Sequence, residues 1–414
     1  MQRYHLFIIL LSTFISLLGI GIIVPIMPVL ATELGATGLT LGLIIAAFSL
    51  SRTLLLPVVG NLSDRFGRKG FLSCGLLIYS LVGLAFPQAH SIANILLIRT
   101  FHGVGSAMIV PIAMAYVSDM SPQGQEGRSM GMLNVAIFSG IGCGPLIGGF
   151  FTDRWGMPSA FYAMSSLSLI ALLLVIIKIP AGLAAKAKAS PALGLFQALG
   201  QMRQNRRTLG ILLARMTTML IMVPTMGFLP LLMNQWFQAS GTKIGVVIAC
   251  RTLANAICQT PFGRLAERYN PVWLLLTGST IISLVMCLVP LAGHYWLLLT
   301  LFICLGIGEA IIWPSLGALA AVEGRLYGQG TMMGVFNMAM SAGILLGSLT
   351  AGACSDILGL NWSFVIIGVV VFGITLFAAR LMLGPTKGGE DGGVFVDGEA
   401  GNPPRPPFDK GGRR

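Results

Sequence analysis

Residues 60–70, GNLSDRFGRKG, bring four charged side chains and three glycines together in a chain of which only 10% is charged. Apolar runs flank this stretch on both sides, at about 41–60 and 71–88. Each run approaches the length of about 20 apolar residues that a helix needs to cross the hydrocarbon core of a bilayer. We therefore expect residues 60–70 to form a short polar loop between two membrane-spanning helices.

Runs of the same kind follow one another along the chain, 55% of which is hydrophobic. They predict twelve spans, at about 6–30, 41–60, 71–88, 92–115, 129–151, 158–180, 209–233, 242–262, 272–291, 295–320, 328–351 and 361–383. The first run exceeds the apolar core of about 7–15 residues that signal peptides contain, so we expect it to be retained as a span. The predicted fold class is an all-α polytopic membrane protein.

The two halves of the chain repeat each other with an offset of 203 residues. The offset aligns Gly60 with Gly263, Asp153 with Asp356, and GRSMGMLN (127–134) with GTMMGVFN (330–337). A repeat of six spans preserves the direction of each helix, so it predicts two parallel six-helix halves with a path between them. The predicted segments are a first half at 1–180, a cytoplasmic linker at 181–207, a second half at 208–383 and a disordered cytoplasmic tail at 384–414.

The distribution of Lys and Arg predicts the orientation in the membrane. With both termini in the cytoplasm, 20 of the 26 basic residues fall in cytoplasmic segments, 2 fall in outer loops and 4 fall within spans. This asymmetry follows the positive-inside rule. It also accounts for the net charge of +12 without a nucleic-acid partner, for which the sequence carries no motif. We expect a multi-pass protein of the cell membrane, which in a bacterium is the inner membrane.

Five stretches resemble motifs of the major facilitator superfamily, in a resemblance that covers residues 1–383. GNLSDRFGRK (60–69) fills every fixed position of the family's Gly-x-Leu-x-Asp-Arg-x-Gly-Arg-Lys signature, and GRLAERYN (263–270) resembles a degenerate second copy. IRTFHGVGSA (98–107) resembles the family's membrane-embedded arginine motif, and GIGCGPLIGG (140–149) resembles a motif associated with export by antiport. LGIGIIVPIMP (18–28), with Gly19, Pro25 and Pro28, is similar to span one of the twelve-span drug:proton antiporter group. The resemblance implies the major facilitator fold and a monomeric protein.

The resemblance also implies two gating elements. The cytoplasmic gate would comprise Gly60, Asp64, Arg65, Gly67, Arg68 and Lys69. Asp64 is expected to hold the cytoplasmic side shut by charge-dependent contacts across the halves, for which a helix N-terminus is a suitable partner. The hinge in span five would comprise Gly140, Gly144, Pro145, Gly148 and Gly149. Small residues at this spacing let another backbone approach closely, and a static packing seam is the alternative interpretation.

Ionisable residues inside the predicted spans are candidates for function, because each costs about 2.5–3.5 kcal/mol at the centre of a membrane helix. The candidates for proton coupling or the substrate pathway are Arg52, Arg99, His102, Arg251 and Glu309. His102 follows Arg99 by three residues, so the two share a helix face, and histidine titrates near physiological pH. A hydrogen-bonded interior histidine is the alternative for His102. An ion pair with Arg215 or Arg251 is the alternative for Glu309.

Prolines interrupt spans one and seven, which are equivalent helices of the two halves. The four prolines are Pro25, Pro28, Pro224 and Pro230. Broken helices at equivalent positions point to a substrate site and its gates. Span seven also carries four methionines (Met216, Met219, Met222 and Met226), which offer an adaptable apolar wall, although ordinary packing is the better explanation for most of them.

These features predict a proton-coupled exporter of small amphipathic molecules that works by alternating access. The proton gradient would supply the energy, and no cofactor or metal is expected. A facilitator or importer of a small metabolite or sugar, and a non-transporting membrane sensor, are the alternatives. The sequence holds no nucleotide-binding loop or catalytic motif, so an ATP-driven pump or an enzyme is not expected. Since arginines outnumber acids in the spans, neutral and anionic amphiphiles are candidates beside cations.

The role that the resemblance gives to Asp64 can be tested by Asp64→Asn, which keeps the size of the side chain and removes its charge. We expect transport to fall more than the amount of protein in the membrane. The measurement is flux per mole of purified protein in proteoliposomes. Unchanged flux per mole would remove Asp64 from the gate.

Overall fold

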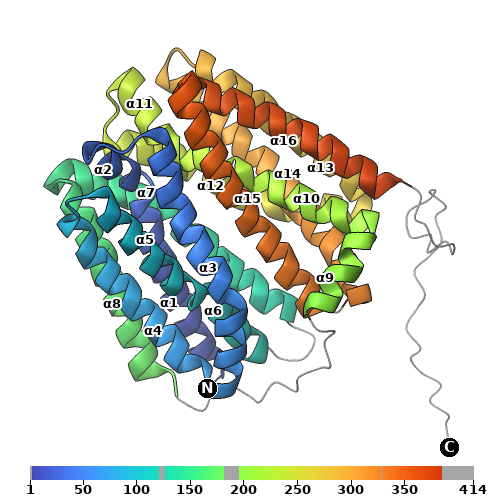
Figure 1. Cartoon of the computed structure of the whole chain (residues 1–414). Helices are drawn as coiled ribbons and strands as arrows, with labels where there is room; N and C mark the ends of the chain where they lie inside the picture. The colour runs from blue at the N-terminus through green and yellow to red at the C-terminus, as the bar shows by residue number, and fades with distance from the viewer. Residues whose placement is uncertain (1, 121–125, 181–194, 328, 385–414) are drawn as a thin grey trace, which may run out of the picture. The chain divides into compact units, whose positions relative to one another are not determined.

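The computed structural model describes residues 2–120, 126–180, 195–327 and 329–384. The side chains of Asp64, Arg65 and Glu267 lie outside the described part, as does the predicted disordered tail beyond residue 384. The helices of the first half, from blue to green, lie on one side of the molecule, and those of the second half lie on the other (Figure 1). The predicted division into two helical halves is therefore visible in the arrangement of the chain.

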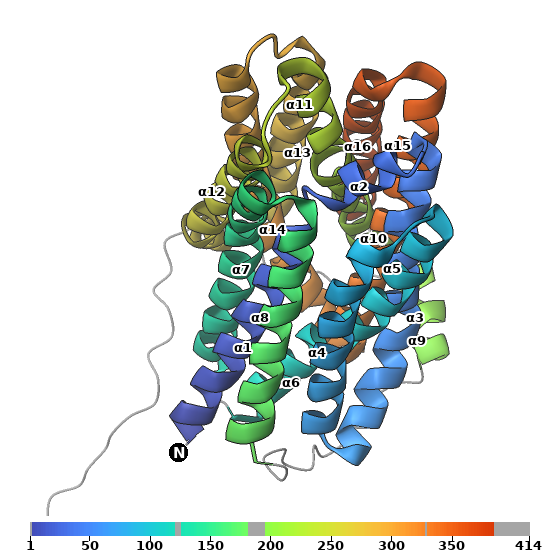
Figure 2. The ribbon, with the colours of Figure 1, turned by 90° about the vertical axis from the view of Figure 1, so that its left-hand side faces the viewer.

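The first half consists of eight helices in the described residues. They are α1 (Gln2–Ile23), α2 (Met27–Glu33), α3 (Gly38–Phe66), α4 (Arg68–Ala85), α5 (Ile92–Ala107), α6 (Val110–Met120), α7 (Glu126–Trp155) and α8 (Met157–Lys178), with the 3-10 turn η1 (Phe86–Gln88) after α4. Two of the six spans are each built from a pair of helices, α1 with α2 and α5 with α6. Figure 2 shows these helices from the side of the first half.

The second half repeats this order. Its helices are α9 (Leu195–Gln204), α10 (Arg206–Leu220), α11 (Leu229–Phe237), α12 (Gly241–Arg268), α13 (Pro271–Leu288), α14 (Tyr295–Tyr327), α15 (Gln329–Leu358) and α16 (Leu360–Leu383). The π-helix η2 (Val223–Phe228) joins α10 to α11, and the 3-10 turn η3 (Val289–Leu291) follows α13. Helix α9 and the first residues of α10 occupy the end of the segment 181–207, which the sequence analysis treats as linker.

The described residues contain twelve helical segments long and apolar enough to cross a membrane, which confirms the predicted number of spans. The interruptions lie at the predicted prolines. Helix α1 ends at Ile23, and α2 begins at Met27 with Pro28 in its first turn. In span seven, Pro224 lies in η2 and Pro230 lies in the first turn of α11. Proline lacks the amide hydrogen that a continuous helix requires, so the backbone changes its hydrogen-bond pattern there.

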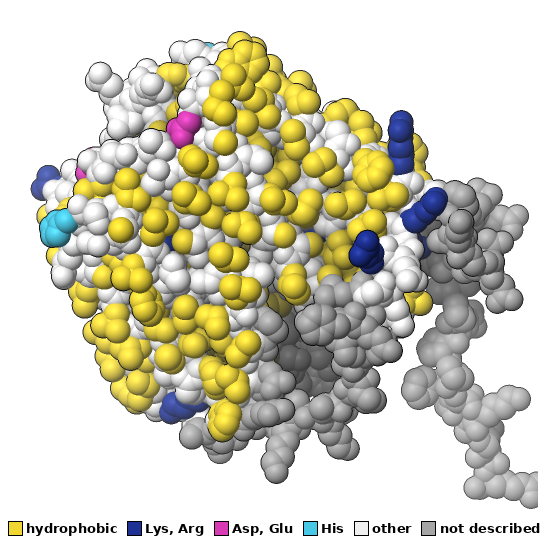
Figure 3. All heavy atoms as spheres, in the orientation of Figure 1, with side chains coloured by type: hydrophobic (Ala, Val, Ile, Leu, Met, Phe, Trp, Pro, Cys, Tyr) yellow, Lys and Arg dark blue, Asp and Glu magenta, His cyan; other side chains and the backbone are white. Residues whose placement is uncertain are grey.

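Apolar side chains cover most of the face seen in Figure 3, while Lys and Arg gather near its edges. Many of the exposed residues are large and apolar, such as Leu54, Ile177, Ile257 and Val369. Water would penalise a surface of this kind, whereas lipid chains match it. The exposed apolar face therefore agrees with the multi-pass arrangement.

Two carboxylates at one end of the bundle connect the halves reciprocally. Asp153 at the end of α7 accepts hydrogen bonds from the first amides of α12, those of Gly241 and Thr242, both at 2.8 Å. Asp356, its equivalent at the end of α15, accepts from the first amides of α3, those of Gly38 and Leu39, at 2.6 and 2.8 Å. Each carboxylate thus caps a helix of the other half, where unpaired amides and the helix dipole favour a negative charge.

Glycines let the capped helices approach closely. A side chain at Gly149 would collide with the backbone of Gly241, and one at the equivalent Gly352 would lie 2.6 Å from the Gly38 carbonyl oxygen. Among the described glycines, contacts of this kind between the halves lie along 38–45, 142–153, 227–253 and 348–356, and the rings of Phe138 and Trp313 meet farther from the caps. Three other glycines lie farther from the caps: Gly60 on α3, Gly317 on α14 and Gly334 on α15. A Cβ added at any of them would meet no described atom within 4 Å. The close glycine contacts between the halves in the described residues therefore lie toward the end of the bundle away from the start of α1.

Removing these caps should open that end. A helix cap contributes about 0.5–2 kcal/mol, which changes the ratio of two states by about 2- to 30-fold. We expect Asp153→Asn and Asp356→Asn, singly and together, to lengthen the distance between spin labels at Trp155→Cys and Leu291→Cys. The measurement is double electron–electron resonance in a background without the seven native cysteines. Glu33→Gln, an exposed acid of the same end, serves as the control and should leave the distances unchanged.

Candidate functional site

A cavity of about 170 Å³ lies between the halves, about two helical turns from the capped end. Helices α1, α2, α3 and α5 line it from the first half, and the α10–η2 region and α15 line it from the second. Its wall consists of Ile20, Ile23, Val24, Met27, Pro28, Ile45, Phe48, Ser49, Arg99, His102, Met222, Val223, Met226, Gly227 and Ile344. Arg99 and His102 are the ionisable members of this wall. Two further cavities are lined by both halves: one of about 470 Å³ at the capped end, beside Gly38 and Ser355, and one of about 340 Å³ between α3 and α15 farther from the caps.

Arg99 and His102 form one buried polar pair on α5. The Arg99 Nη1 atom lies 3.1 Å from His102 Nδ1, and Arg99 Nε donates to the carbonyl oxygen of Ile44 at 3.4 Å. The Arg99 guanidinium also lies 4.4 Å from the centre of the Phe48 ring. Because arginine only donates, His102 Nδ1 must accept, which assigns the neutral ring with its proton on Nε2. The ring edges of Phe48, Tyr79 and Phe86 surround this histidine.

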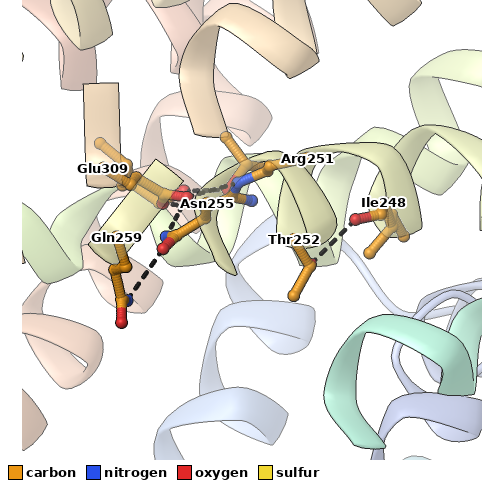
Figure 4. Close-up of polar contacts among 8 residues, drawn as sticks. Ile248, Arg251, Thr252, Asn255, Gln259 and Glu309 are labelled. Carbon is orange, nitrogen blue, oxygen red and sulfur yellow. Dashed lines mark hydrogen bonds and ion pairs between the residues drawn. The ribbon is translucent and has the colours of Figure 1, made fainter. Parts of the chain in front are cut away.

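Arg251 and Glu309 form a separate ion pair inside the second half (Figure 4). Arg251 Nε donates to Glu309 Oε2 at 3.1 Å, and Arg251 Nη2 bonds Glu309 Oε1. Thr225 on η2 accepts from Arg251 Nη1 at 2.6 Å, while Asn255 donates to the same carboxylate at 3.4 Å. The network extends to Gln259, which donates to Asn255 at 3.0 Å. It therefore ties α12 and α14 to the irregular turn of span seven.

The remaining span arginines have different surroundings. Arg52 lies half-buried on α3 beside Gly103, and its Nε atom has no hydrogen-bond partner among the described residues. Arg215 is buried on α10 with its guanidinium against the rings of Trp313 and Phe336. Of the five coupling candidates, the structure thus brings Arg99 together with His102 and Arg251 together with Glu309. It does not bring all five into one cluster.

The predicted hinge lies between a helix of its own half and a helix of the other half. Gly140, Gly144 and Gly148 face α1, where the position of a Cβ at Gly140 would lie 2.7 Å from the Phe14 carbonyl oxygen. Gly149 and the backbone carbonyl of Pro145 face α12 at Gly241 and Gly245, while the Pro145 ring lies against Gly21 of α1. In the span-one motif, Gly19 packs on Met164 of α8, Pro25 lies in the break after α1, and Pro28 lines the cavity. The motif glycines therefore set the approach of α7 to α1 and α12.

The prediction of a loop over residues 60–70 is wrong: α3 continues to Phe66 and α4 begins at Arg68, so only Gly67 separates the two helices. Gly67 joins the two helices with a φ of +95°, a backbone conformation that other residues rarely adopt. Arg68 is buried, and Lys69 Nζ donates to the carbonyl oxygen of Ile176 on α8 at 2.8 Å. Gly60 has open space around it. The contacts expected of Asp64 and Arg65 lie outside the described side chains.

Sequence analysis missed a buried acid near the end of span ten, because it ended that span at residue 320. Helix α14 continues to Tyr327, and Glu323 is only 3% exposed. Its carboxylate accepts from Thr208 Oγ1 at 2.5 Å and lies 3.4 Å from Arg207 Nε, so it holds the start of α10. The roles of Asp153 and Asp356 were also missed, although the 203-residue offset had aligned them. The same offset aligns Gly38 with Gly241 at the starts of α3 and α12. This pair of glycines could have indicated that the two aspartates lie close to these helix starts.

No group of three or more His, Cys, Asp or Glu side chains among the described residues is arranged to hold a metal ion. What the site offers is an apolar chamber with two neighbouring polar groups, enclosed by helices from both halves. Such a chamber can hold a small molecule with an apolar body. The matched helices on its two sides are typical of a secondary transporter.

Comparison with known families agrees with this architecture. The family model described as Major Facilitator Superfamily matches residues 9–235 and 209–394. The chain belongs to this superfamily. It is a multi-pass membrane transporter and not an enzyme. The first match covers the first half and continues through most of span seven, and the second match covers the second half.

Relatives of nearly the same length are found in an archaeon and in a bacterium. An uncharacterised MFS-type transporter of Methanocaldococcus jannaschii is 29% identical over 374 residues, which cover 89% of this chain and 96% of that protein. Quinolone resistance protein NorA of Staphylococcus aureus is 27% identical over 379 residues, which cover 90% of this chain and 95% of that protein. Among solved structures, a bacterial homologue of the human lysosomal transporter Spinster superposes with a TM-score of 0.79 at 14% identity, covering 92% and 98%. The structure of the human organic anion transporter MFSD10 superposes with a TM-score of 0.68 at 19% sequence identity, covering 92% of this chain and 99% of that chain. At these identities the solved structures support the fold alone.

Breaking the Arg251–Glu309 pair should destabilise the protein strongly. We expect Glu309→Gln to lower the free energy of unfolding by about 3–5 kcal/mol, because Arg251 would remain buried without a counter-charge. The double variant Arg251→Met with Glu309→Leu, which removes both charges, should recover most of this loss. The measurement is unfolding of the purified protein in detergent, with Glu33→Gln as an exposed control. A single variant as stable as the parent would show that the pair is unimportant for stability.

Proposed function

We propose that this chain is a proton-coupled exporter of small amphipathic molecules that works by alternating access. The observation that carries the proposal is the cavity between the halves, which lies next to the reciprocal caps of Asp153 and Asp356. A site between two bodies that are joined at one end can be exposed at either end by rocking of those bodies. The alternation of such states is how secondary transporters of this architecture move a substrate.

The charge distribution supports an orientation for this cycle. Basic residues gather in the segments at the end of the bundle where α1 begins, which the positive-inside rule assigns to the cytoplasm. In that orientation the capped end would face outward, and the reciprocal caps would hold the outer ends of the halves together. Export requires the reciprocal caps to release so that the cavity can open outward. In a bacterium the protein would lie in the inner membrane.

Proton coupling is proposed to act through the polar pair of the first half. His102 accepts a hydrogen bond from Arg99 only while its ring is neutral. Protonation turns Nδ1 into a donor and places two positive groups side by side, so the contact must separate. A proton would thereby change how Arg99 faces the cavity. Glu309 is the second candidate carrier, since its protonation would release Arg251 from the network that reaches η2.

The similarity to NorA supports export of drug-like molecules. That relative is named for quinolone resistance, and this chain covers 95% of its length at 27% identity. The apolar wall and its methionines, Met27, Met222 and Met226, suit ligands of variable shape. Facilitated diffusion or import of a metabolite is the alternative transport function, and a sensor that keeps the fold without transport is the alternative of another class.

The proposal is tested with purified protein in liposomes whose lumen is made acidic, so that protons leave as substrate enters. We expect norfloxacin, a quinolone, to accumulate above its outside concentration and to accelerate the proton efflux reported by luminal pyranine. Protein-free liposomes control for passive trapping of the drug in the acidic lumen. Equilibration without accumulation would reject proton coupling in favour of a facilitator.

Variants connect this flux to the proposed coupling residues. We expect Arg99→Ala and Glu309→Gln to abolish accumulation at equal amounts of folded protein in the membrane, with folding of the destabilised Glu309→Gln variant checked by its unfolding transition. Retained accumulation in both would remove these residues from the coupling mechanism. If neither norfloxacin nor a wider panel of cations, neutral compounds and anions moves at all, the sensor interpretation replaces the transporter.

A further inference from the structure

We propose that the cavity binds amphipathic organic anions, with the acid group of the ligand on Arg99 and its apolar body against the opposite wall. This inference gives a substrate class to the proposed transport function and rests on it for its physiological role. Binding itself can be measured without transport. The argument starts from the charge balance of the first half.

Arg99 is a buried cation whose partners within the protein carry no negative charge. It is 8% exposed, and its contacts are the Ile44 carbonyl oxygen, His102 Nδ1 and the Phe48 ring. No described residue forms an ion pair with it. A guanidinium has five N–H donors, of which these contacts use two, so several donors remain for a ligand. A buried charge without a counter-charge is costly, and a bound anion would remove that cost.

The second half differs at the position that pairs with an acid. Of its two described buried arginines, Arg251 is paired with Glu309 through two hydrogen bonds, whereas Arg215 lies against the rings of Trp313 and Phe336 outside the cavity. At a distance of 203 residues, the first half has Phe48 in place of Arg251 and Ser106 in place of Glu309. The buried cation of the first half is instead Arg99, and no acid stands at the position equivalent to Glu309. Every acid of residues 1–180 lies near the end of a span or in a loop, namely Glu33, Asp64, Asp119, Glu126 and Asp153.

The rest of the cavity favours an apolar body and disfavours a cation. Facing Arg99 from the second half are Met222, Val223, Met226 and Ile344, which carry no charge. Ser49 adds one hydroxyl, and no acid belongs to the wall. An ammonium group placed here would meet Arg99 without a carboxylate to offset the repulsion. A carboxylate or sulfonate can instead take two parallel hydrogen bonds from the guanidinium.

The test uses three ligands with one aromatic body and different head groups: 2-naphthylacetate, 2-naphthylacetamide and 2-(2-naphthyl)ethylammonium. Their dissociation constants are measured by calorimetry on the full chain in detergent, with thermal unfolding as a second readout. We expect the anion to bind at least about tenfold tighter than the amide, as a charged hydrogen-bonded pair contributes roughly 1.5–3 kcal/mol. The ammonium should bind weakest.

Arg99→Met removes the proposed anchor and keeps an apolar side chain of similar length. We expect the ratio of anion to amide affinity to fall to about one in this variant, while the amide still binds, which shows that the cavity has folded. Arg215→Met is the matched control, because Arg215 is also a buried arginine but lies outside the cavity wall. It should keep the preference for the anion. Arg99→Lys, which keeps the charge without the planar fork, should retain part of it.

Two outcomes overturn the inference: tighter binding of the ammonium than of the anion by the parent protein, or an unchanged anion preference in Arg99→Met. The same ligands in proteoliposomes separate this inference from the proposed function. If the anion binds through Arg99 but none of the three ligands nor norfloxacin moves, transport fails and the binding site stands. If norfloxacin or the ammonium is driven by a proton gradient while the anion neither binds nor moves, the proposed function stands and the anion site is rejected.

Discussion

The interaction on which the rest of the structure depends is the reciprocal capping of α3 and α12 by Asp356 and Asp153. Lipid chains are as apolar as the helix surfaces, so the bilayer provides little hydrophobic force to press two halves together. Directed hydrogen bonds and close backbone packing must supply the attachment. The caps and the glycines beside them provide both at one end of the bundle. The cavity lies farther along the same helices, where side chains of both halves line it.

The internal repeat explains why the scaffold is symmetric while its chemistry is not. The caps, their glycines and the breaks in spans one and seven recur at equivalent places, because both halves must cross the same membrane and contact each other reciprocally. The interior charges do not recur. The cap of α12 even has an additional bond from the Thr242 hydroxyl at 2.5 Å, for which Leu39 of α3 offers no equivalent. The two connections between the halves are therefore similar in place and unequal in strength.

The sequence predicted the spans, their breaks and the repeat, because hydrophobic length, proline and a constant offset depend on local features of the chain. It could not predict the partners of buried charges, because those depend on how helices rotate about their axes. Glu309 illustrates the limit: two arginines were candidates, and only packing of α12 on α14 selects Arg251. Glu323 illustrates another, since the hydropathy pattern ended span ten before the helix ends. Whether the motif glycines act as a hinge remains a prediction that their placement does not test.

The unequal charge balance of the halves also suggests why a substrate and a proton would compete for one residue. Arg99 can donate to neutral His102 or to a ligand in the cavity, and a protonated His102 would repel it. A ligand changes the balance between two states only through a difference in its affinity for them. An anion on Arg99 provides such a difference if the guanidinium faces the cavity more fully in one state than in the other. The neighbouring histidine then links protonation to this equilibrium without a direct contact between proton and substrate.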